Sequence, residues 1–144
     1  MICAYDIDGV LAEAPPTAAK KWGLMNGAER RARLAQLERH YRKARVLHHP
    51  MSSFWAVSAR KENTRQITED WLARHFKMCQ GVFLLSGPRT TERVVKFKIA
   101  ALRQVNAQEF TEDNLRVLRA VARQLTECQC YWFDGKRRIP LCDI

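Results

Sequence analysis

The stretch that most constrains this chain lies near residue 1, where a short apolar run leads directly into two carboxylates. Residues 2–5 are largely apolar, and Asp6 and Asp8 follow them, just before Gly9. A continuous apolar run of this length is typical of a strand buried on both faces of a parallel sheet. Ligands of such sheets bind beyond the carboxyl ends of the strands, where Asp6 and Asp8 would emerge. Neighbouring acids repel each other, so this pair needs a cation, a proton or a phosphate-bearing partner.

An Asp-Gly turn that closes a hairpin is the alternative explanation of the same residues. The rest of the chain favours the parallel sheet, because strand-like and helix-like patterns alternate along it. Further strands are predicted at 53–58, 81–85, 108–111 and 128–133, and helices at 28–46, about 60–76, 91–105 and 115–125. We therefore expect an α/β fold: a Rossmann-like three-layer sandwich with a five-stranded parallel sheet and right-handed crossovers. The 144 residues amount to a single domain.

Residues 13–50 are too long for a simple crossover, and they predict a small helical cap inserted after the first strand. An apolar stripe at i, i+3, i+7 and i+10 indicates its helix, namely Leu34, Leu37, Tyr41 and Ala44. Positions 14–50 hold nine basic and two acidic residues, so they carry +7 of the formal net charge of +10. Such a surface favours a polyanionic partner, such as a nucleic acid or nucleotide. A basic helix face that is merely solvated is the alternative.

Several classes of protein receive no support from the sequence. No run approaches the roughly 18 apolar residues of a membrane span, and no apolar stretch follows a basic N-terminus as in a signal peptide. We therefore expect a cytoplasmic protein that does not associate with membranes. The five cysteines include no Cys-x-x-Cys pair, which indicates reduced thiols. Gly-rich phosphate loops and the His-Glu-x-x-His and Gly-x-Ser-x-Gly motifs are also absent.

Polar side chains follow three of the predicted strands at the same edge of the sheet. Asp6 and Asp8 come after the first strand, Ser58 ends the second, and Glu112 and Asp113 follow the fourth. Because the carboxyl ends of parallel strands meet at one edge, we expect these side chains to gather there. Four acids and a hydroxyl suit a divalent cation, and oxygen ligands of this kind favour Mg²⁺.

Basic side chains that could hold an anion beside that cation come from two places. Lys96 and Lys98 lie on the predicted helix after the third strand. On a helix they point about 200° apart, so only one of them can face the site. Arg60, two residues after Ser58, could also contact a phosphate, although arginines on a surface are often idle.

Taken in order, these motifs resemble the four motifs of the haloacid dehalogenase-like (HAD) phosphatase superfamily. They are Asp-x-Asp-Gly-Val at residues 6–10, the strand-final Ser58, a lysine, and Glu-Asp at 112–113. The third motif is matched best by Lys98, which an apolar residue follows. The resemblance covers residues 2–133, and it implies a Rossmann-like phosphatase that depends on Mg²⁺.

The resemblance also implies a role for each residue. Asp6 would be the nucleophile that forms an aspartyl-phosphate, and Asp8 would act as general acid and then as general base. Asp6, the backbone carbonyl of Asp8, and Asp113 would hold Mg²⁺, with Glu112 acting through a water. Ser58 and the lysine would hold the phosphoryl oxygens.

The cap occupies the position in which this superfamily inserts one, and the layout is similar to the phosphatase domain of polynucleotide kinase. We therefore expect a phosphomonoester hydrolase that acts on nucleotides or phosphorylated nucleic-acid ends. A small-metabolite phosphatase with a solvated cap is the alternative within the same class. A nucleic-acid-binding or regulatory module on this scaffold is the alternative from another class, although such a module has no need of Asp8 beside Asp6.

Overall fold

The protein is described from a computed structural model that covers all 144 residues. Its elements follow one another as β1 (Cys3–Tyr5), η1 (Trp22–Leu24), α1 (Gly27–Lys43), β2 (Phe54–Lys61), η2 (Glu62–Thr64), α2 (Arg65–His75), β3 (Cys79–Leu85), α3 (Thr91–Val105), β4 (Glu109–Glu112), α4 (Leu115–Gln124), β5 (Gln129–Phe133), β6 (Arg138–Pro140) and η3 (Leu141–Asp143). The α and η labels mark α-helices and short 3₁₀ turns. The predicted alternation of strands and helices, and with it the α/β class, is confirmed.

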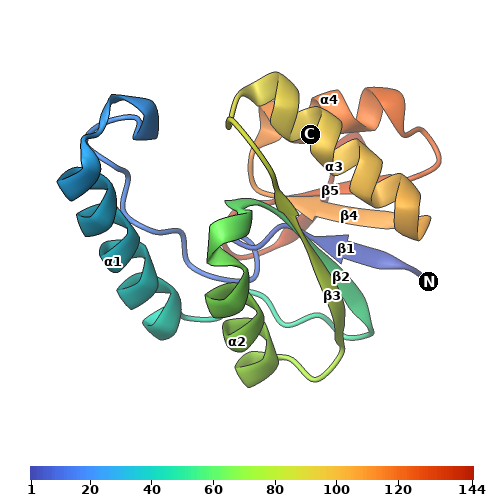
Figure 1. The fold of residues 1–144 in the computed structure, drawn as a ribbon. Helices are drawn as coiled ribbons and strands as arrows, with labels where there is room; N and C mark the ends of the chain where they lie inside the picture. Colours follow the sequence, from blue (N-terminus) through green and yellow to red (C-terminus); the bar gives the residue numbers. More distant parts are fainter.

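One sheet runs through the whole molecule, with the strand order β3-β2-β1-β4-β5-β6. The first five strands of the chain pair in parallel, and β6 pairs antiparallel with β5. This order is compatible with a Rossmann-like, doubly wound sheet, in which the strand order reverses between β1 and β4. Figure 1 shows β1 in the middle of the sheet, with strands on both sides of it.

The prediction of a five-stranded, purely parallel sheet is wrong, because the structure adds a sixth strand that runs antiparallel to β5. After β5 the chain turns back through a tight loop, in which Asp134 Oδ1 accepts hydrogen bonds from the N–H groups of Lys136 and Arg137, both at 2.8 Å. Gly135 has a φ of 103°, a left-handed conformation that suits glycine. The chain then adds β6 to the edge of the sheet. Asp-Gly directly after an apolar run is a hairpin signal, so the sequence does carry this information.

The second strand is longer than predicted. It was expected to end at Ser58, but β2 continues to Lys61, which is in register with Leu85 of β3 after an irregularity in the pairing. The following helix begins at Arg65 and not near residue 60. As a result, Arg60 is part of the sheet, where its side chain is 2% exposed.

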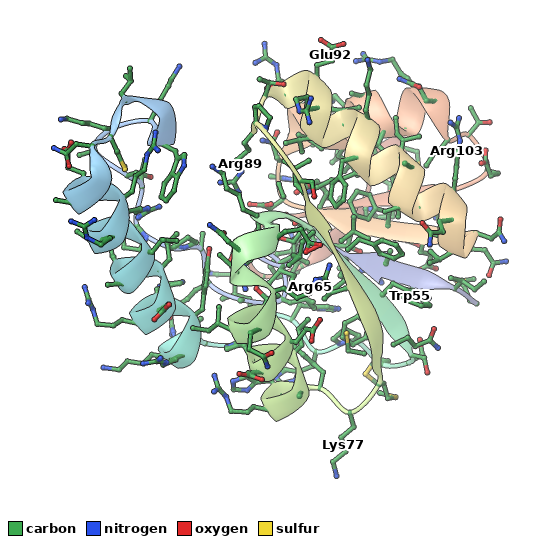
Figure 2. The ribbon with its side chains drawn as sticks, viewed as in Figure 1. Trp55, Arg65, Lys77, Arg89, Glu92 and Arg103 are labelled. Carbon is green, nitrogen blue, oxygen red and sulfur yellow. The ribbon has the colours of Figure 1, made fainter.

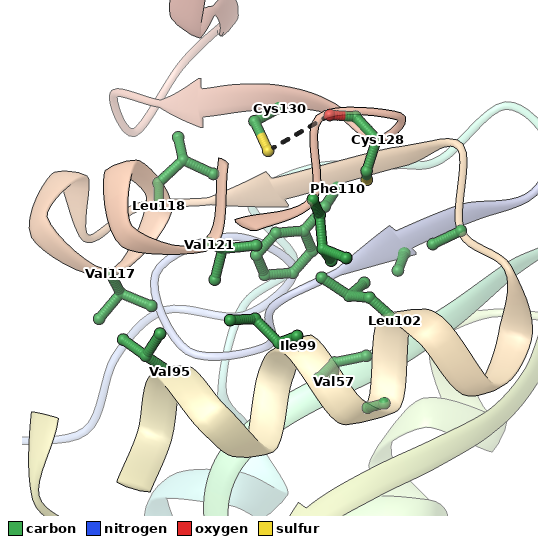
Figure 3. Packing of buried hydrophobic residues seen from close by; sticks show 14 of the residues in the cluster. Val57, Val95, Ile99, Leu102, Phe110, Val117, Leu118, Val121, Cys128 and Cys130 are labelled. Carbon is green, nitrogen blue, oxygen red and sulfur yellow. Dashed lines mark hydrogen bonds between the residues drawn. The ribbon is translucent and has the colours of Figure 1, made fainter. Parts of the chain in front are cut away.

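Helices cover both faces of the sheet (Figure 1). The apolar sides of α3 and α4 pack on one face against β4, and Figure 3 shows that core, to which Val95, Ile99, Leu102, Phe110, Leu118 and Val121 belong. The predicted apolar stripe of α3 is therefore buried as expected. On the other face, Trp71 and Leu72 of α2 pack with Ile7, Leu11 and Phe54. No α-helix of the protein has the length and apolar character required to span a bilayer.

The segment between β1 and β2 carries η1 and α1, which stand apart from the sheet beyond α2 (Figure 1). A capping box begins α1, because the Asn26 side chain and the Glu29 side chain each accept the other residue's backbone N–H. The two ends of the segment pair with each other through Ala12 and Val46, and the Glu13 N–H donates to the Arg45 carbonyl at 3.0 Å. The cap therefore leaves and re-enters the body through one narrow neck.

We predict that Trp71 fastens this cap to the body. Its side chain is fully buried, and its indole N–H donates to the Ala44 carbonyl, just past the end of α1, at 3.0 Å. Trp71→Phe removes that bond and leaves a small cavity, so it should lower the free energy of unfolding by about 2–4 kcal/mol. Urea denaturation measures the change. Trp55→Phe is the control, because Trp55 is only partly buried and its indole makes no hydrogen bond in the structure. Equal losses of unfolding free energy in the two variants would refute this role of Trp71.

Candidate active site

The candidate site lies where β1 and β4 end side by side. Tyr5, the last residue of β1, is in register with Thr111 of β4. Asp6 follows β1, and its backbone N–H donates to the Thr111 carbonyl at 3.0 Å. Glu112 ends β4, and Asp113 begins the next loop. The sheet itself therefore fixes the relative positions of three of the predicted acids, at the point where its strand order reverses.

A tight loop after Asp6 shapes the backbone around the site. The carbonyl of Ile7 accepts hydrogen bonds from the N–H groups of Val10, Leu11 and Ala12 at 2.9–3.1 Å. Gly9, in the same loop, has a φ of 86°. A Cβ at Gly9 would lie 2.2 Å from Oδ2 of Asp113, so only glycine lets that carboxylate approach the loop. This contact explains the glycine of the Asp-x-Asp-Gly motif.

Three carboxylates and one ammonium form the centre of the site. Carboxylate oxygens of Asp6, Glu112 and Asp113 all lie within 4.8 Å of one another. The Lys98 ammonium, 3% exposed, contacts Oδ1 of Asp6 at 3.3 Å and forms a hydrogen bond with Oε1 of Glu112. The other oxygen of Glu112 accepts the backbone N–H groups of Asp113 and Asn114 at 3.0 and 3.2 Å. Glu112 is thus held at both ends of its carboxylate.

The charges within this cluster do not balance. Burial, and then repulsion from Glu112, raises the pKa of the Asp6 carboxyl well above its usual value. Burial and the hydrogen bond with Glu112 raise the pKa of Asp113 to about 7. Burial also acts to raise the pKa of Glu112, but the Lys98 ammonium and the hydrogen bonds from Asp6 and Asp113 hold it at about 2. One ammonium stabilises one carboxylate, and the other two retain affinity for a further positive charge.

That chemistry fits a hard divalent cation. The donor set consists entirely of carboxylate oxygens, which are the ligands that Mg²⁺ prefers, and Asp113 is the most exposed of the three. A cation there would replace the protons that the raised pKa values of Asp6 and Asp113 indicate. Asp6, Glu112 and Asp113 are therefore the residues that could hold a metal.

Asp8 lies in a different environment from Asp6. Its carboxylate accepts two hydrogen bonds from Arg60, from Nε at 3.0 Å and from Nη2 at 2.7 Å. Arg60 also donates from Nη1 to the Thr68 hydroxyl at 3.0 Å, and its guanidinium carbon lies 3.7 Å from the centre of the Tyr41 ring. Tyr41 belongs to α1, so the cap contributes directly to the environment of Asp8. This fork-shaped ion pair fixes the direction in which Asp8 points.

The structure places only some of the predicted phosphate-binding residues in the acidic cluster. Lys98 lies in the cluster, whereas Lys96 is 75% exposed and pairs with Glu92 at 3.1 Å, so the structure does not bring Lys96 to the site. Arg60 was predicted as a phosphate ligand, but in the structure its guanidinium is engaged with Asp8 and with its neighbours in the body and the cap. Ser58 is buried at 1% exposure, and its hydroxyl accepts the backbone N–H of Arg60 at 3.1 Å.

Three residues near the site were not predicted to take part in it. Tyr41 was assigned only to the apolar stripe of the cap helix, and Thr68 lies in a helix with no motif. Trp132 of β5 donates its indole N–H to the Asp113 carbonyl at 2.8 Å, which fixes the loop that carries this acid. The sequence holds no local signal for any of the three, because each contact joins segments that are distant along the chain.

No protein-family model matches the chain, and no curated protein sequence is significantly similar to it. The residues of the site therefore carry the functional assignment. They form a cluster of three acids beside a lysine, two of them buried, with a third aspartate, Asp8, held separately by an arginine. Two carboxylates of one motif, Asp6 and Asp8, are thereby placed in contrasting environments, which is the usual arrangement for a pair with different chemical roles.

We predict that Lys98 is essential for the stability of the site and that Lys96 is not. Lys98→Met leaves the buried carboxylates of Asp6 and Glu112 without their ammonium, so it should lower the free energy of unfolding by about 3–5 kcal/mol at neutral pH. Lys96→Met is the matched control on the same helix, and since it breaks only an exposed pair it should change stability by about 0.5 kcal/mol or less. Urea denaturation of both variants measures this. Similar losses in the two would contradict the arrangement described above.

Proposed function

We propose that the protein is a Mg²⁺-dependent phosphomonoester hydrolase that acts through an aspartyl-phosphate on Asp6. The observation that carries the proposal is the cluster of Asp6, Glu112 and Asp113 around Lys98, with Asp8 held apart from it. These are the acids and the lysine in which the sequence resembles HAD phosphatases. Neither that resemblance nor the α/β fold alone would suffice, because one fold hosts many functions.

The first half of the reaction follows from the positions of the two aspartates. A carboxylate oxygen of Asp6 attacks the phosphorus atom, and the bond from phosphorus to the leaving oxygen breaks. Asp8, which must take up a proton before this step, gives that proton to the leaving oxygen, and Arg60 stabilises the carboxylate that remains. The product of this half is an aspartyl-phosphate and a free alcohol.

In the second half, Asp8 takes a proton from a water that attacks the phosphorus atom of the aspartyl-phosphate. The bond from phosphorus to the Asp6 oxygen breaks, which releases inorganic phosphate and restores both carboxyl groups. Lys98 stays beside Asp6 and offsets part of the negative charge throughout. A Mg²⁺ held by Asp6, Glu112 and Asp113 would supply the further positive charge that lets an anionic phosphate approach an anionic carboxylate.

The preferred substrates are nucleotides and phosphorylated nucleic-acid ends. Support comes from the cap, which reaches the partner of Asp8 through Tyr41 and carries a large excess of basic residues. A polyanionic substrate would be attracted to such a surface and would bind less tightly as the salt concentration rises.

The direct test is the release of phosphate from mononucleotides, from 3′- and 5′-phosphorylated oligonucleotides and from an aryl phosphate. We expect release only with Mg²⁺, and loss of release on chelation or in Asp6→Asn, which removes the nucleophile. Glu92→Gln, an exposed acid on α3 remote from the cluster, is the control and should retain full activity. Release that needs no metal, or that persists in Asp6→Asn, would refute the mechanism.

The role of Asp8 has its own test. Asp8→Asn cannot activate the water of the second step, so turnover should fall by about 10²–10⁴-fold. An aryl phosphate has a leaving group that needs little protonation, and its phenol should therefore appear in a rapid burst of one equivalent per protein. Stopped-flow absorbance follows this burst. If Asp8→Asn gives steady turnover at the normal rate, Asp8 is not the acid and base.

A further inference from the structure

An aromatic ring on the cap lies among cations at the edge of the site. Trp22 belongs to η1 and is only partly buried. The guanidinium carbon of Arg30 lies 5.4 Å from the centre of its ring, and the ammonium of Lys61 lies 4.7 Å from it. Arg30 comes from α1 and Lys61 from the end of β2. Two segments that are distant along the chain thus bring their cations to one indole ring.

These cations have no acidic partners. Neither Arg30, Lys61 nor Arg89 has a carboxylate within ion-pair distance. Partial burial, followed by the charges of Arg89 and Arg30, lowers the pKa of Lys61, which agrees with the crowding of like charges. In Figure 2, Arg89 extends from the loop between β3 and α3 on the side of the body that faces the cap. Two cations beside one ring, with the charge of Arg89 acting on one of them, call for an anionic partner.

The position of this group relative to the catalytic residues identifies that partner. Lys61 directly follows Arg60, which holds Asp8. In the proposed function Asp8 protonates the leaving oxygen, so the leaving group must lie on the Asp8 side of the phosphorus atom. Lys61 places Trp22 at the end of β2, next to the residue that holds Asp8. The part of the substrate that they contact is therefore the part beyond the scissile phosphate.

We propose that Trp22, Arg30, Lys61 and Arg89 form a subsite for single-stranded nucleic acid whose terminal phosphate is the one removed. A base stacks on Trp22, and the phosphodiesters that follow it lie against the three cations. A mononucleotide would not satisfy them, because its only phosphate is at Asp6. A duplex would not stack on Trp22, because its bases already stack on one another. The direction of the strand rests on the proposed function, whereas its binding does not.

Equilibrium binding tests the subsite without any turnover. The probe is a short fluorescein-labelled DNA strand with a 3′-phosphate, titrated with the full-length protein in EDTA and followed by fluorescence anisotropy. We expect Trp22→Ala to weaken binding about tenfold, since base stacking on an aromatic side chain is lost. Trp22→Phe keeps an aromatic face and should restore most of the affinity. Leu24→Ala, at a 72% exposed residue of the same turn, is the control and should bind like the unchanged protein.

Lys61→Gln tests the cations separately, at the partly buried last residue of β2, and it keeps most of the length of the side chain. Removing one phosphate contact should lower the slope of log K against log salt by about 0.7. An abasic strand of the same length should bind Trp22→Ala and the unchanged protein equally. Binding that is indifferent to Trp22 and Lys61 would overturn the subsite, and so would a mononucleotide or a duplex that binds as tightly as the single strand.

The outcomes also separate this inference from the proposed function. If phosphate release fails but binding depends on Trp22, the subsite stands and the phosphatase is wrong. If the protein hydrolyses an aryl phosphate but shows no binding that depends on Trp22, the phosphatase stands and the subsite is wrong. Where both hold, Trp22→Ala should lower the ratio of kcat/KM for the oligonucleotide to that for the aryl phosphate about tenfold.

Discussion

The contact of the Lys98 ammonium with Asp6 and Glu112 is the interaction on which the rest of the site depends. Asp6 and Glu112 are buried and lie with Asp113 in a group whose carboxylate oxygens are within 4.8 Å of one another, and such a group needs positive charge beside it. Lys98 reaches them because α3 is held in one rotation about its axis by a buried apolar side that includes Val95 and Ile99. The hydrophobic core of one face of the sheet therefore positions the charge that makes the acidic cluster possible.

The two aspartates of the first motif show how one loop can supply two kinds of acid. Asp6 belongs to the sheet edge, where burial and Glu112 raise its pKa and where it contacts the Lys98 ammonium. Asp8, two residues later, belongs to an ion pair with Arg60 that Tyr41 of the cap covers. Gly9 makes both arrangements compatible, because the loop can then turn closely past Asp113. A nucleophile and an acid–base need this kind of difference in environment.

Local patterns in the sequence sufficed to predict the fold class and the acids of the cluster. They did not predict which side chains contact those acids in every case. An apolar run before Asp6 predicted a strand of a parallel sheet that is buried on both faces, and helical geometry predicted that only one of Lys96 and Lys98 could face the site. The pairing of Arg60 with Asp8 could not be predicted, because it depends on β2 continuing past Ser58 and on a contact between segments distant in the chain. The sixth strand had a local signal in its Asp-Gly turn, and it was missed.

The narrow neck at Ala12 and Val46 has a consequence for how such a protein can diversify. Both ends of the inserted segment lie side by side. The length of the segment between them therefore has little effect on the positions of the strands in the sheet. The proposed recognition surface and the proposed catalytic residues consequently lie in separate parts of the chain, which meet at contacts such as Tyr41 with Arg60, Ala44 with Trp71, and Trp22 with Lys61. Descendants of such a chain can exchange one recognition surface for another without altering a single strand of the sheet.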